Sequence, residues 1–185
     1  MATHVSALSM SCYYQLRQLC SVAESRSMDA SKTLVHAFVS SRLDYCNSLL
    51  YGISDGLLQK LQSIQNAAAR LITRARRRDH ITPVLRQLHW LPVRQRIMFK
   101  VACLVFQSLS NQAPEYLSVD CRLVTGSLRS SDIRTCKVLL THTSFGDRSF
   151  STSGPDLWNS LPKDIRQTDI TYNHFKRLLK TFLFN

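Results

Sequence analysis

The stretch that decides the fold is VRQRIMFKVACLVFQSL, residues 93–109. In a helix built from it, apolar side chains point in nearly every direction, and its charges, Arg94, Arg96 and Lys100, lie in the first turns. A helix that is hydrophobic all round is a buried core helix. The longest apolar run in it, Val101 to Phe106, is far shorter than the roughly 20 residues that a membrane span needs. We therefore expect a central helix of a folded domain and no transmembrane helix.

The residues before this helix carry the three- and four-residue apolar spacing of amphipathic helices. We expect one helix over residues 5–20, a second from a cap at Ser27 to Gly52, and a third from Ser54 or Asp55 into the arginines after residue 70. Serine caps a helix N-terminus well, and glycine can take the left-handed conformation that ends one. The pattern predicts a mainly α fold, a multi-helix bundle.

The composition changes after residue 111, where proline, glycine and serine interrupt the periodicity. We expect a helical domain over 1–112, an irregular connector over 113–145 and a small helical subdomain over 146–185. Within the connector we expect one turn of helix at residues 114–117 and a short strand at Lys137–Thr141. The last subdomain should hold a short helix opened by Gly154-Pro155 and an amphipathic helix from Phe175 to Leu183.

The cysteines and histidines do not form a metal-site pattern. The six cysteines include no CxxC pair, and no histidines accompany them at zinc-ligand spacing. Cys12, Cys20, Cys46 and Cys103 fall on apolar faces of the expected helices, where a free thiol packs as a small hydrophobe. We therefore expect no metal, no cofactor and a reducing, intracellular location, nucleus or cytoplasm. The N-terminus also lacks the charged and apolar regions of a secretory signal.

Positive charge is the most unusual property of the chain. Lys plus Arg is 24 and Asp plus Glu is 12, which gives a net charge of +12. Residues 70–100 hold nine basic residues and one acid, Asp79, so 9 − 1 = +8 of that charge lies in this stretch. A solvated helix end is one explanation, because arginines in the last turn also complement the helix dipole.

Clustered guanidinium groups repel one another unless an anion relieves them, and the planar arginine fork fits phosphate. We place Arg70, Arg74 and Arg77 on the helix face opposite the apolar stripe. The sequence thus predicts a nucleic-acid-binding patch, and its residues are Arg70, Arg74, Arg76, Arg77, Arg78, Arg94, Arg96 and Lys100. The expected partner is RNA or an RNA–DNA hybrid, bound without sequence preference.

No catalytic constellation accompanies this patch. The carboxylates stand singly, so paired metal-binding acids are missing. The chain has neither a GxSxG elbow nor a glycine-rich phosphate loop. We predict no catalytic residue and no enzymatic activity.

Several long motifs, in order, resemble one family. They are SRLDYCNSLLYG (41–52), LQSIQNAAARLITR (61–74), HITPVLRQLHWLPVR (80–94), APEYL (113–117), LRSSD (128–132), GDRSF (146–150) and PDLWNSLP (155–162). Together they are similar to the region downstream of the polymerase in LINE-type (non-LTR) retrotransposon reverse transcriptases of animals. The resemblance implies a thumb-like or post-thumb helical segment. The family's catalytic aspartates would lie upstream, so its polymerase activity cannot be assigned to any residue here.

The resulting hypothesis is a catalytically incomplete C-terminal part of such a reverse transcriptase that binds nucleic acid through the basic patch. One alternative is a helical protein-interaction module in which the Trp158 motif and the last helix pack on the upstream polymerase. A further alternative is a pseudogene product without function.

Overall fold

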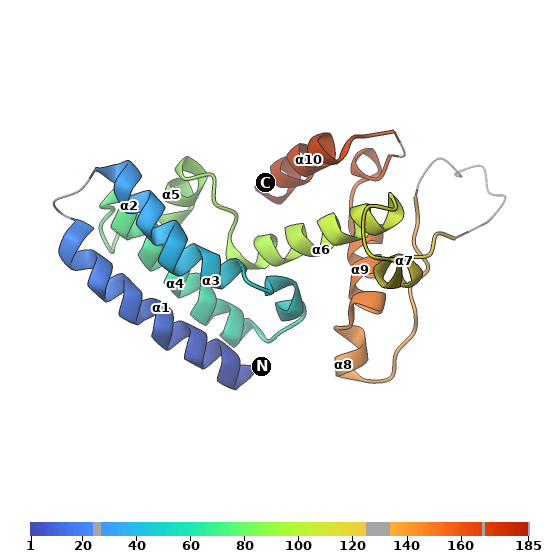
Figure 1. Ribbon diagram of the computed structural model, residues 1–185, viewed down its shortest axis with the longest axis horizontal. Helices are drawn as coiled ribbons and strands as arrows, with labels where there is room; N and C mark the ends of the chain where they lie inside the picture. The colour runs from blue at the N-terminus through green and yellow to red at the C-terminus, as the bar shows by residue number, and fades with distance from the viewer. Residues whose placement is uncertain (24–26, 125–133, 168, 185) are drawn as a thin grey trace. The chain divides into compact units, whose positions relative to one another are not determined.

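The computed structural model describes residues 1–23, 27–124, 134–167 and 169–184, and these are mainly helical (Figure 1). The predicted fold class, a mainly α multi-helix bundle, is confirmed. Within the described ranges the only β-type pairing is one isolated antiparallel bridge between Leu123 and Cys136. The short strand expected at Lys137–Thr141 is wrong, since these residues have no regular structure. A strand needs a partner along its length, and the pairing here extends only to the Lys137 amide, which donates to the Arg122 carbonyl at 2.8 Å.

The chain divides into two compact units, Met1–Arg96 and Ile97–Asn185. The division falls inside one helix, α6 (Val93–Leu109). The domain boundaries expected at residues 112 and 145 are inferred from composition, whereas the two units are defined by packing. These boundaries therefore remain predictions.

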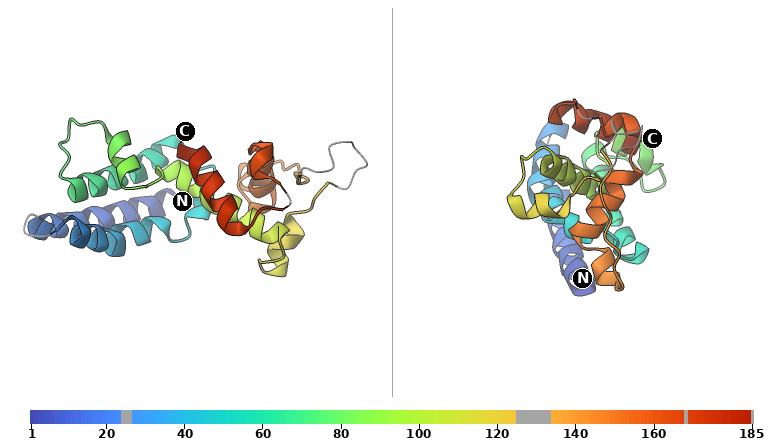
Figure 2. Two further views of the ribbon diagram at one scale, coloured as in Figure 1. Left: turned by 90° about the horizontal axis from the view of Figure 1, so that it is seen from above. Right: turned by 90° about the vertical axis from the view of Figure 1, so that its right-hand side faces the viewer.

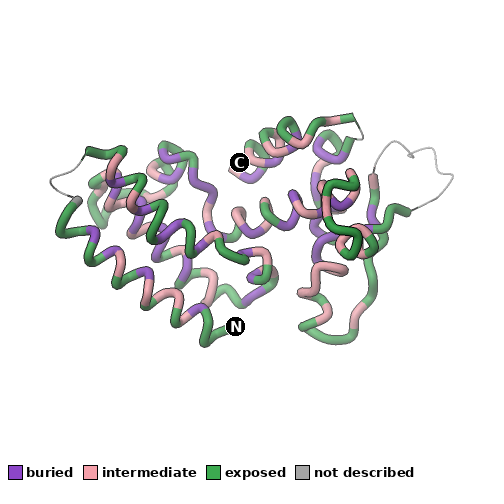
Figure 3. Tube along the Cα trace, viewed as in Figure 1, coloured by how far each residue is buried: buried purple, intermediate pink, exposed green. Residues whose placement is uncertain are grey.

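The first unit is built from helices that pack against one another (Figure 2). Its elements are α1 (Ala2–Ala23), α2 (Met28–Val35), the π-helical η1 (His36–Ser40), α3 (Ser41–Asp44), the 3₁₀ turn η2 (Asn47–Leu50), α4 (Asp55–Thr73) and α5 (Ile81–Gln87). Helix α1 packs against α4, and each buries most of its predicted apolar stripe, as the recurring buried positions along α1 show (Figure 3). Ser27 caps α2 as predicted, accepting a hydrogen bond from the Ala30 amide at 3.3 Å.

The helix expected to run from Ser27 to Gly52 is interrupted. It ends at Asp44, where Tyr45 is extended and Cys46 has a left-handed φ of 50°. Gly52 has a φ of 68°, as its position after the last turn predicts. The sequence does not reveal this break, because Leu43, Asn47 and Leu50 are all buried and keep the four- and three-residue spacing of a helix across it.

The second unit is organised around an aromatic cluster. Its elements are α6 from Ile97 onwards, α7 (Glu115–Asp120), α8 (Ser144–Asp147), α9 (Phe150–Ser160), η3 (Lys163–Ile165) and α10 (Tyr172–Phe184). The rings of Phe106 and Phe175 stack with their centroids 4.4 Å apart. The centroid of the Trp158 ring lies 6.4 Å from that of Phe106 and 5.7 Å from that of Phe175. The Trp158 indole nitrogen donates to the Arg134 carbonyl at 2.8 Å. Burying a large aromatic together with a satisfied N–H is strongly favourable.

Helix α9 starts earlier than predicted. It begins at Phe150, so Gly154 and Pro155 lie inside it instead of opening it. Gly154 permits a close approach to α6, because a Cβ there would lie 3.1 Å from a methyl group of Val105. Packing thus overrides the local tendency of proline to begin a helix.

The six cysteine thiols differ in their exposure to solvent. Cys12, Cys103, Cys121 and Cys136 are buried, whereas Cys20 and Cys46 are exposed. The prediction that Cys20 and Cys46 pack as small hydrophobes is therefore wrong. Cys20 lies beyond the buried edge of the α1 stripe, and Cys46 lies at the break after α3.

Candidate nucleic-acid interface

The predicted patch is distributed over three segments and two units. Arg70 lies in the last turn of α4, and Arg74, Arg76, Arg77 and Arg78 follow in the connection to α5. Arg94 and Arg96 lie in the first turn of α6 and belong to the first unit. Lys100 lies one turn later, is exposed and belongs to the second unit.

The arginines after position 73 do not extend the helix. Helix α4 ends at Thr73, and Arg74 has the left-handed φ of 56° that usually ends a helix. The expectation that Arg74 and Arg77 lie on one helix face with Arg70 is therefore wrong. The chain instead forms an exposed turn, and we call Arg74, Arg76, Arg77 and Arg78 the basic loop.

The Arg70 side chain binds the backbone of this loop. Its guanidinium donates to the carbonyl oxygens of Arg76 at 3.3 Å and Asp79 at 3.2 Å. The Asp79 carboxylate accepts a hydrogen bond from the Arg76 amide at 2.7 Å. Asp79, the one acid of residues 70–100, therefore binds the backbone of the loop. Arg70, in the last turn of α4, binds the backbone of the same turn.

Arg94 and Arg96 have carboxylate partners within the first unit. Arg94 forms an ion pair with Asp55, the first residue of α4. Arg96 pairs with Asp44 at 2.8 Å, and its guanidinium lies 5.6 Å from the centre of the Trp90 ring. The Arg96 side chain is only 17% exposed. The covered Arg96–Asp44 pair stabilises the start of α6, whereas the exposed Arg94–Asp55 pair contributes little to stability.

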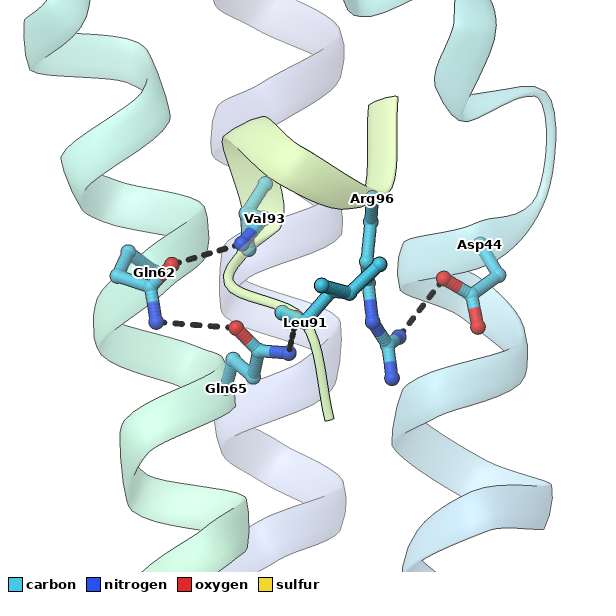
Figure 4. A network of polar contacts seen from close by, with 6 residues as sticks. All are labelled: Asp44, Gln62, Gln65, Leu91, Val93 and Arg96. Atoms are coloured by element: carbon cyan, nitrogen blue, oxygen red, sulfur yellow. Dashed lines mark hydrogen bonds and ion pairs between the residues drawn. The ribbon is translucent and has the colours of Figure 1, made fainter. Parts of the chain in front are cut away.

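A glutamine pair that sequence reasoning missed fixes the same region (Figure 4). Gln65 is 1% exposed and donates to the Leu91 carbonyl at 2.8 Å. Gln62 accepts from the Val93 amide at 2.8 Å and donates to the side chain of Gln65 at 2.9 Å. A buried amide must be hydrogen-bonded, so these contacts hold the start of α6 against α4. The available signal was a polar residue, Gln65, next to Ile64 on the apolar stripe.

Within the basic loop, Arg77 and Arg78 are the residues whose charge remains available. Arg76, Arg77 and Arg78 are exposed, and the structure gives the Arg77 and Arg78 side chains no hydrogen bond or ion pair with any described residue. The loop holds four guanidinium groups against the single carboxylate of Asp79. Such a turn can bind consecutive phosphates, since each fork presents several donors.

Across residues 1–23, 27–124, 134–167 and 169–184, no group of three or more His, Cys, Asp and Glu side chains is placed to hold a metal ion. No helix in these ranges is long and apolar enough to cross a membrane. The LRSSD motif (128–132) lies outside the described residues. No protein-family model, curated protein or solved structure matches the chain.

Proposed function

We propose that this chain is the post-palm segment of a LINE-type reverse transcriptase and that it holds template RNA or an RNA–DNA hybrid by its basic loop. The resemblance of the motifs between residues 41 and 162 supports the family assignment. The observation that carries the binding role is the exposed basic loop, held in shape by Arg70 and Asp79.

The mechanism is electrostatic positioning. Each arginine that contacts a phosphate releases condensed counterions, so the affinity is independent of sequence and falls steeply with salt. Because Arg70, Arg94 and Arg96 have partners in the protein, we assign them to support of the fold. Arg76, Arg77 and Arg78 are the phosphate contacts.

The alternative of a protein-interaction module relies on the Trp158 motif and the last helix, and it stays a second prediction. Trp158 is 0% exposed within the second unit. Its side chain therefore cannot contact a partner while this unit is folded, and the proposal rests on the basic loop instead.

The test is the salt dependence of nucleic-acid binding by the double variant Arg77→Gln/Arg78→Gln. We expect weaker binding to RNA and to the hybrid, and a salt slope smaller by about two, roughly one per phosphate contact. Fluorescence anisotropy across a salt series measures both quantities.

The matched control is Lys163→Gln/Arg177→Gln, which removes the same charge from two exposed sites in the second unit. An unchanged slope in the loop variant, or an equal change in the control, would refute a specific role of the loop.

A further inference from the structure

A groove between α1 and α4 is not used by the proposed function. It consists of two adjoining hollows of about 340 and 620 Å³ that share Tyr13. From α4, the lining residues are Lys60 and Ser63 in the first hollow and Ala67 and Leu71 in the second. The groove lies wholly within the first unit.

The groove leads to the basic loop. Lys60, Ser63, Ala67 and Leu71 are spaced three or four residues apart, so they form one stripe along α4. On α1 the lining advances in the same direction, from Ser6 in the first hollow to Cys20 in the second. The two helices therefore run in the same direction, and the second hollow ends about one helical turn before Arg74, where the loop begins.

Exposed aromatic and basic side chains line this groove, with Tyr13 and Tyr14 between Lys60 of the first hollow and Arg17 of the second. Tyr13 is 46% exposed, Tyr14 62% and Met10 70%. Arg17 and Lys60, which line the second and first hollows, are exposed as well.

Carboxylates are nearly absent from the two helices that form the groove. Helix α1 contains no Asp or Glu, and the only acid of α4 is Asp55. Asp55 is already paired with Arg94. The charge of the groove therefore complements a polyanion, and neither hollow is lined by an acidic side chain.

We propose that the groove binds single-stranded nucleic acid, with bases stacked on Tyr13 and Tyr14 and the backbone directed along Arg17 and Lys60 toward the basic loop. This inference rests on the proposed function and specifies its substrate. Every base has a π-face, so exposed tyrosines bind any unpaired strand, whereas a duplex keeps those faces covered. The distance along α4 from Lys60 to Arg74 is about 21 Å, enough for about four nucleotides.

The test compares two strands of equal charge and length, an oligothymidylate and an abasic strand, by fluorescence anisotropy. We expect the wild-type chain to prefer the oligothymidylate. The Tyr13→Leu/Tyr14→Leu variant should lose at least about tenfold in affinity for it, with an unchanged salt slope and unchanged binding to the abasic strand. Tyr13→Phe/Tyr14→Phe keeps the rings and should bind as the wild type does.

The variant chains should fold, since both tyrosines are exposed, and circular-dichroism melting verifies this. If the double leucine variant melts early, Tyr14→Leu alone takes its place, with an expected loss of about fivefold or more. Wild-type affinity for oligothymidylate in the leucine variant would overturn the inference and point to a protein as the occupant of the groove. An equal loss on the abasic strand would overturn it too. Failure of the proposed function is a separate result, namely an unaltered salt slope in Arg77→Gln/Arg78→Gln.

Discussion

At the scale of single residues, identical side chains have different surroundings and therefore different properties. Arg96 is mostly covered and pairs with Asp44, whereas Arg77 is exposed in the basic loop. The thiols differ in the same way. Burial raises the pKa of Cys103 to about 11, and it raises that of Cys121 to about 11 and of Cys136 to about 12. The buried thiols are therefore protonated at neutral pH.

This difference predicts selective thiol labelling. At pH 8 we expect iodoacetamide to modify Cys20 and Cys46 in the native protein, while the four buried thiols react only after denaturation, because the thiolate is the nucleophile. Mass spectrometry of tryptic peptides measures the sites. Because their folded-state pKa values are raised, the buried thiols favour the folded state below about pH 9, and this contribution is lost as the pH rises toward 12. Rapid native modification of Cys103 would contradict the packing of the second unit.

At the scale of elements, hydrogen bonds from Arg70 and Asp79 hold the turn between α4 and α5. Arg70 donates two of them to loop carbonyls. Lysine retains the charge but cannot reproduce the planar fork. The basic loop is therefore a structured element whose geometry is set from inside the first unit.

We predict that Arg70→Lys opens this loop while α4 remains folded. Two lost hydrogen bonds of about 1 kcal/mol each should raise the rate of trypsin cleavage after the loop arginines by about tenfold or more. Timed proteolysis with peptide mapping measures it. Lys60→Arg, at an exposed site on the same helix, is the control and should cleave in the loop at the wild-type rate. Equal rates in Arg70→Lys and wild type would show that the fork does not hold the loop.

At the scale of the whole molecule, each compact unit contains one tryptophan. Trp90 is 7% exposed in the first unit, and Trp158 is 0% exposed in the second. The variants Trp90→Phe and Trp158→Phe therefore report on one unit each by fluorescence.

The substitution Phe175→Ala should destabilise the second unit by about 3–5 kcal/mol, because it leaves a cavity beside Phe106 and Trp158. Denaturant unfolding followed at Trp158 measures the loss, and the transition at Trp90 should change little. Phe182→Ala is the control, since this residue of α10 is 41% exposed and should cost much less. An equal shift at both tryptophans would show that the two units unfold as one.

The sequence by itself determined the helices, the mainly α class and the concentration of charge in residues 70–100. Apolar spacing and the cap at Ser27 are local properties, so they can be identified without knowledge of the packing. The same locality explains the errors: the break at Cys46 keeps helical spacing, and the proline at 155 lies inside a helix that the packing at Gly154 accommodates.

The tertiary structure decided which charges are available. Arg94 pairs with a carboxylate 39 residues away, and Arg96 with one 52 residues away. The groove likewise needs two helices from distant parts of the sequence, α1 and α4. Partners so far apart are chosen by packing, which periodicity does not encode, so only the fold separates the structural arginines from the exposed basic loop.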